Sequence, residues 1–115
     1  MGGDGLQDAV RNDIAVARKH LVQHDGLKVV AVKGGDVIGS GRGKGILPLL
    51  NLVDELGPEL EGGSVADRVI GRAAAFILLQ AKVKGVFGQT LSTEAESLLQ
   101  AAGLEVAGDE RVPFI

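Results

Sequence analysis

The sequence predicts an α/β fold, a three-layer α-β-α sandwich around a mixed sheet of about four or five strands. Short runs rich in β-branched residues alternate with segments of helical periodicity along the chain. A hairpin signal, Gly34-Gly35-Asp36, lies near the start and indicates an antiparallel strand pair. A strand–helix–strand pattern closes the chain, and such units form parallel crossovers. Antiparallel and parallel pairs together make the sheet mixed.

The first half of the chain is predicted to supply two helices and the hairpin. Apolar residues recur at three- and four-residue steps over residues 6–24, which is typical of an amphipathic helix. "LKVVAVK" (27–33) and "DVIGS" (36–40) are the two hairpin strands. "ILPLLNLVDEL" (46–56) is a short helix with its proline in the first turn, where the missing N–H costs nothing.

The longest predicted helix covers residues 64–83, "SVADRVIGRAAAFILLQAKV". Ser64 and Asp67 have the spacing of a capping box at its start. Residues 73–79 are apolar on every side, so we expect another element to cover the outer face of this helix.

The final strand–helix–strand unit begins with "VFGQTL" (86–91) and ends with "LEVA" (104–107). The helix between them, "STEAESLLQAAG", has Thr93 and Glu96 at capping-box spacing. "RVPFI" is predicted to be a tail that adds at most a short edge strand.

Composition excludes several classes of function. The 115 residues are expected to form a single domain, residues 1–115. A net charge of -3 and three phenylalanines as the only aromatic residues argue against nucleic-acid binding. The chain has no cysteine, so disulfides and thiolate metal sites are ruled out. No apolar run is long enough for a membrane span and no export signal is evident, so we expect a cytoplasmic protein with no membrane partner.

A glycine-rich stretch between the hairpin and the next helix is the first candidate site. In "GSGRGKG", glycines at positions 39, 41, 43 and 45 alternate with three polar residues. Backbone N–H groups of such a turn, the helix dipole and two cations would suit an anion. The spacing fits neither a Walker loop nor a dinucleotide fingerprint, and a solvated flexible turn is the alternative. The predicted ligand-binding residues here are Ser40, Gly41, Arg42, Gly43 and Lys44.

"ADRVIGR" supplies the second set of candidate residues. On a helix, Arg68 and Arg72 would share one face, available to a carboxylate or a bound anion. Asp67 is the one weak candidate for a catalytic group, with capping as its alternative. If the start of this helix lies beside the glycine-rich stretch, the two sets form one site, and this convergence is our main site hypothesis.

Two further features carry less weight. His20 and His24 are one helical turn apart, but no third ligand is evident, so we predict no metal site and no cofactor. Ser92 has no histidine placed to activate it and is better explained as a residue at a helix start.

"IGSGRGKGILPLL" and "VADRVIGRAAAFILL" resemble the signature blocks of an uncharacterised bacterial family of small proteins, a domain of unknown function classed with the cytidine-deaminase-like fold. The resemblance implies that fold over nearly the whole chain. Zinc deaminases carry a His/Cys-x-Glu motif at the helix after the hairpin and Pro-Cys-x-x-Cys at the next helix. The equivalent helix starts here would be "SVADRVIG" and "STEAESLL", which hold neither Cys nor His. Zinc-dependent deamination is therefore excluded.

The sequence thus favours a zinc-less deaminase-like domain that binds an anionic, phosphate-bearing small molecule, with nucleotides among the candidates. One alternative is an enzyme of unknown reaction that uses Asp67 with Arg68 or Arg72 in the same cleft. Another is an interaction protein without catalysis. We expect a homo-oligomer in each case, because the apolar helix needs more cover than a small domain provides.

Overall fold

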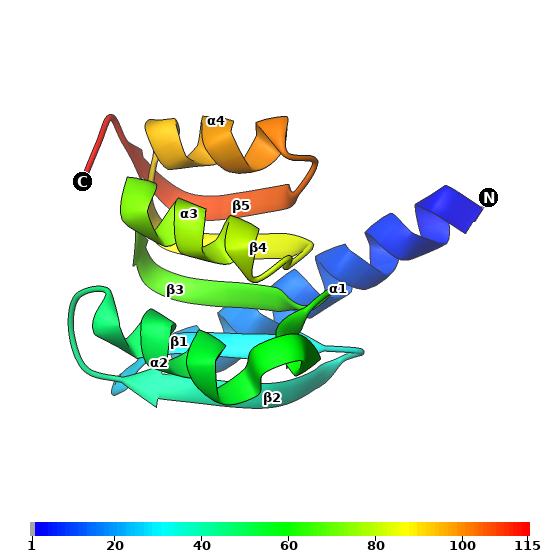
Figure 1. Cartoon of the computed structure of the whole chain (residues 1–115), viewed down its shortest axis with the longest axis horizontal. Coiled ribbons are helices and arrows are strands. Elements are labelled where there is room, and N and C mark those ends of the chain that lie inside the picture. The colour runs from blue at the N-terminus through cyan, green and yellow to red at the C-terminus, as the bar shows by residue number, and fades with distance from the viewer. Residues whose placement is uncertain (1) are drawn as a thin grey trace.

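The computed structural model describes residues 2–115, with side chains from residue 5 onward. The chain begins with a helix and a hairpin, after which helices and strands alternate (Figure 1). In chain order they are α1 (Gly2–Gln23), β1 (Leu27–Lys33), β2 (Asp36–Arg42), α2 (Leu47–Leu56), the 3-10 helix η1 (Gly57–Leu60), β3 (Ser64–Ile70), α3 (Arg72–Gln80), β4 (Gly85–Ser92), α4 (Thr93–Ala101) and β5 (Glu105–Val112).

The sheet has five strands in the order β2-β1-β3-β4-β5. β1 is antiparallel to both β2 and β3, whereas β3, β4 and β5 run parallel to one another. Helix α1 crosses one face of the sheet, and α2, α3 and α4 lie on the other (Figure 1). The predicted three-layer α/β fold with a mixed sheet is confirmed.

Alternating side chains of the strands form two cores, one on each face of the sheet. In β1, Val29 and Ala31 pack under α2, α3 and α4, whereas Val30 and Val32 pack under α1. All four are fully buried, which explains why this strand has an unbroken apolar run. Among the described residues, no helix combines the length and apolarity of a membrane span.

The predicted helix over residues 64–83 is wrong. Its first part is the central strand β3, and only Arg72–Gln80 is helical. β3 pairs with β1 on one side and with β4 on the other, and this pairing outweighs the local helical pattern. Gly71 separates the two elements in an extended conformation. The Ser64–Asp67 capping box and the shared helix face of Arg68 and Arg72 therefore do not exist.

The expected cover over α3 is absent within the described chain. Its buried face consists of Ala74, Ala75 and Leu78, but the side chain of Phe76 on the outer face is 46% exposed. The sequence alone could not show that this helix is short and packs on one side only.

Helix α4 begins at a serine cap. Ser92 Oγ accepts a hydrogen bond of 3.0 Å from the Ala95 N–H, as the cap interpretation of Ser92 predicts. Thr93, which was predicted to cap this helix, instead donates its hydroxyl to the Pro113 carbonyl. β5 is longer than predicted, since part of the expected tail pairs with β4.

Candidate functional site

The ends of the strands and the starts of three helices lie together at one edge of the sheet. β3, β4 and β5 end at this edge, and β1 begins there because it is antiparallel to β3. β2 also ends there, since Arg42 pairs with Leu27. Helices α2, α3 and α4 all start from this edge, at the left in Figure 1. In open α/β sheets, ligands bind outside the carboxyl ends of the strands.

A pocket of ≈ 330 Å³ lies at this edge between the starts of α2 and α3. Small-molecule sites begin at about this size. Two cations, Lys28 and Arg72, contribute to an otherwise apolar or glycine lining. The remaining lining residues are Gly45, Ile46, Val69, Gly71, Ala73, Ala74 and Ile115.

Lys28 forms a buried ion pair beneath this pocket. Its Nζ donates to Asp67 Oδ1, and the two side chains are only 12% and 1% exposed. The backbone N–H of Val69 donates to the same oxygen at 3.1 Å. Burial raises the pKa of Asp67, although Lys28 and the backbone N–H groups oppose this shift. Lys28 lines the pocket and Asp67 does not, so Lys28 is the member of the pair that a ligand would meet.

Sequence reasoning missed Lys28. The signal was its position, because this lysine interrupts the otherwise apolar residues 27–32 of a strand that is buried on both faces. A lysine is rarely buried without a partner, so this position should have prompted a search for a matching carboxylate.

The start of α3 presents backbone N–H groups without a side-chain cap. Gly71 occupies the N-cap position and has no side chain to accept from them, in contrast to Ser92 at the start of α4. Arg72, the first residue of the helix, has an exposed side chain whose nearest carboxylate oxygen, on Glu94, is 4.0 Å away. An exposed pair at that distance contributes little, so Arg72 can exchange Glu94 for an anionic ligand.

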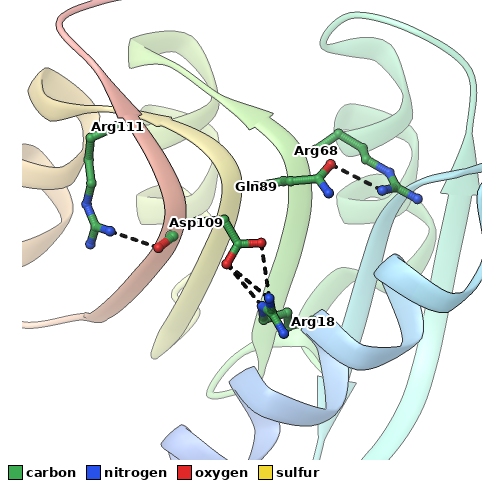
Figure 2. A network of polar contacts seen from close by, with 6 residues as sticks. Arg18, Arg68, Gln89, Asp109 and Arg111 are labelled. Atoms are coloured by element: carbon green, nitrogen blue, oxygen red, sulfur yellow. Dashed lines mark hydrogen bonds and ion pairs between the residues drawn. The ribbon is translucent and has the colours of Figure 1, made fainter.

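Arg68 lies on the opposite face of the sheet and is structural. Its Nη2 donates to the carbonyls of Leu21 and His24 at 2.7 and 3.1 Å, and its Nε donates to the carbonyl of Leu27 at 2.9 Å. The Nη1 group donates to Gln89 Oε1 at 3.2 Å (Figure 2). Arg68 thus satisfies the last carbonyls of α1 and is separated from Arg72 by the sheet.

The glycines at positions 39 and 41 belong to β2 and serve packing. A Cβ at Gly39 would lie 2.8 Å from Leu52 Cδ1, and one at Gly41 would lie 3.4 Å from the carbonyl oxygen of Pro48, both in α2. These two glycines therefore let α2 approach the edge strand closely. Their amides lie in a strand that pairs with β1, so the alternating glycines do not form a continuous anion cradle.

The polar residues of the same stretch do not converge on the pocket. Ser40 and Arg42 alternate with the glycines and face the α1 side, where the Arg42 guanidinium lies against Gly26. Gly43 and Lys44 lie in the exposed turn before α2, in which Gly43 and Gly45 have φ of 120° and 70°. Of this stretch, Gly45 alone lines the pocket.

A second cavity of ≈ 410 Å³ lies between α1 and β5. Both of its arginines already pair with β5 carboxylates: Arg11 with Glu105 at 3.4 Å, and Arg18 with Asp109 at 3.2 Å (Figure 2). Both arginines have a carboxylate within 3.4 Å, closer than the 4.0 Å between Arg72 and Glu94, so this cavity is less suited to an anion than the pocket beside α3.

The described residues contain no group of three or more side chains suited to hold a metal ion. His20 and His24 stack with their ring centroids 4.3 Å apart, and His24 Nδ1 contacts the carbonyl oxygen of His20. The pair fixes the last turn of α1 rather than gathering further ligands.

The family model of the domain of unknown function DUF1893 (TM1506) matches residues 17–115. The chain belongs to this family. The solved structure of a DUF1893 protein from Thermotoga maritima is 25% identical, with a TM-score of 0.76 over 90% of this chain and 69% of that chain. No curated protein matches the sequence.

More distant solved structures share the fold. RibD from Acinetobacter baumannii is 18% identical, with a TM-score of 0.66 over 87% of this chain and 36% of that one. The dCMP deaminase of cyanophage S-TIM5 is 15% identical, with a TM-score of 0.58 over 94% of this chain and 99% of that chain. The deaminase-like fold expected from the sequence is confirmed.

The helix starts compared with the zinc motifs need correction. The helix after the hairpin is α2, and the next one is α3, not the segments beginning "SVADRVIG" and "STEAESLL". The true starts, "GILPLL" and "GRAAAF", also hold neither Cys nor His. The correction therefore does not change the conclusion that this chain lacks both zinc motifs.

Proposed function

We propose that this protein binds a phosphate-bearing small molecule in the pocket between the starts of α2 and α3. The observation that carries the proposal is the pairing of two cations, Lys28 and Arg72, with the uncapped start of α3 around one hollow. A helix start of this kind favours anions through its N–H groups and its dipole.

The apolar part of the lining supports an organic ligand over a bare ion. Ile46, Val69 and Ile115 would contact a body of carbon atoms while the phosphate meets the cations. Nucleotides belong in the first test because the cyanophage neighbour is named a dCMP deaminase.

Thermal unfolding with matched ligand pairs tests this proposal. We expect dCMP and ribose 5-phosphate to raise the melting temperature, and deoxycytidine and ribose to leave it unchanged. A ligand at 100 times its dissociation constant adds about 2.7 kcal/mol to the free energy of unfolding, which is readily detected.

Two arginine variants test whether the phosphate compound binds in this pocket. Arg72→Gln should remove the phosphate-dependent shift, because Arg72 lines the pocket. Arg42→Gln should keep it, because the Arg42 guanidinium lies against Gly26. If Arg42→Gln alone loses the shift, the ligand binds on the α1 side of the sheet and not in this pocket. If no phosphate compound shifts the melting temperature of the natural protein, the proposal is refuted.

An enzyme in the same pocket is the second proposal, and the raised pKa of buried Asp67 favours it. Arg68 cannot take part, because it lies across the sheet. Any reaction in this pocket would need Lys28, the titratable side chain that lines it beside Asp67.

A further inference from the structure

Lys28 differs from the other lysines of the chain. Lys19, Lys33, Lys44, Lys82 and Lys84 are exposed, whereas the Lys28 side chain is 12% exposed and lines the pocket. It is also the lysine whose Nζ contacts a fully buried carboxylate, that of Asp67.

We infer that Lys28 forms an imine with a small phosphate-bearing aldehyde or ketone bound in this pocket. The inference rests on the proposed function for the phosphate, and on the Lys28–Asp67 contact for the chemistry. A lysine that lines a pocket beside a carboxylate is placed for imine formation, because the carboxylate can take the proton that the amine must lose.

Asp67 is placed to accept the proton that Lys28 must lose. A lysine attacks a carbonyl only as the free amine, so the ammonium proton needs an acceptor. Asp67 Oδ1 is in direct contact with Nζ and receives that proton. Burial raises the pKa of Asp67, which brings the neutral acid and amine closer in energy to the ion pair.

The reaction needs no oxidant or reductant. The amine nitrogen forms a bond to the carbonyl carbon, and the carbonyl oxygen takes the proton held by Asp67. Asp67 then takes a proton from the nitrogen and passes it to the hydroxyl group of the carbinolamine, which leaves as water while the freed nitrogen lone pair forms the C=N bond. In total, the ammonium group and the carbonyl compound give a protonated imine and one water molecule.

Reductive trapping tests the inference on the unmodified protein. Dihydroxyacetone phosphate is the probe, and glycerol 3-phosphate is its control, because it has the same phosphate and carbon chain without a carbonyl. After borohydride reduction and proteolysis, peptide mass spectrometry should find the adduct at Lys28. We expect about tenfold or more modification there relative to any exposed lysine, because the pocket holds the carbonyl beside the amine.

Variants then check the roles of the two residues. Lys28→Arg keeps the charge and should lose the pocket adduct, whereas Lys84→Arg should retain it. Asp67→Asn should slow trapping at Lys28 and still permit the melting-temperature shift with glycerol 3-phosphate. Unchanged trapping in a folded Asp67→Asn variant would overturn the role of Asp67.

The outcomes separate this inference from the proposed function. If both phosphates stabilise the protein and Lys28 is modified no more than the exposed lysines, the imine is refuted and phosphate binding stands. If neither phosphate stabilises it and Lys28 stays unmodified, both fail. These melting-temperature shifts and trapping results are measured on the natural protein, so they hold even if a variant does not fold.

Discussion

At the scale of single residues, Arg68 shows how a charged side chain can serve the fold instead of a ligand. Its guanidinium donates to three backbone carbonyls near the end of α1 and to Gln89. We predict that Arg68→Ala lowers the free energy of unfolding by about 2–3 kcal/mol, because partly buried carbonyls lose charged donors. Arg11→Ala is the control, since its exposed ion pairs contribute under about 1 kcal/mol. Urea denaturation measures both, and equal losses would contradict the capping role.

At the scale of elements, the sequence predicted the hairpin, the last helix and the mixed sheet, because their apolar periods and turn glycines are local. It could not predict β3. The apolar residues of "SVADRVI", at positions 65, 66, 69 and 70, have the four-residue spacing of a helix, and only the pairing of this segment with β1 and β4 makes it a strand. The prediction of the candidate site was wrong for the same reason, since Asp67 and Arg68 lie on opposite faces of a strand and not on one helix. Arg72 and Gly45 do line the same pocket, because both follow strands that end at the same edge of the sheet.

Strand β2 and helix α2 give the prediction at this scale. Gly39→Ala should lower the free energy of unfolding by about 1–2 kcal/mol, because the new methyl group would lie 2.8 Å from Leu52 Cδ1 and push α2 from the sheet. Ser40→Ala, on the exposed opposite side of the same strand, should change it by less than about 0.5 kcal/mol. Urea denaturation again gives the comparison. A stabilised Gly39→Ala protein would mean that the glycine serves something other than this close contact.

At the scale of the whole molecule, helices α2 and α3 expose several large apolar side chains. Leu47 and Leu50 of α2 are 60% and 42% exposed, and Phe76 of α3 is 46% exposed. Large apolar groups gathered on one surface mark an interaction site in soluble proteins. We propose that a second copy of the chain covers these side chains of α2 and α3.

Sedimentation or light scattering over a range of protein concentrations tests this proposal. We expect a homodimer that Phe76→Glu dissociates, because a carboxylate at the centre of an apolar interface loses its hydration without gaining a partner. Val37→Glu is the matched control: it alters a comparably exposed residue (41% against 46%) on the hairpin, and should leave the dimer intact. A natural protein that stays monomeric at every concentration would exclude self-association. Dissociation by Val37→Glu but not by Phe76→Glu would place the interface on the edge strand β2, where a strand with open hydrogen-bonding groups can pair with its counterpart.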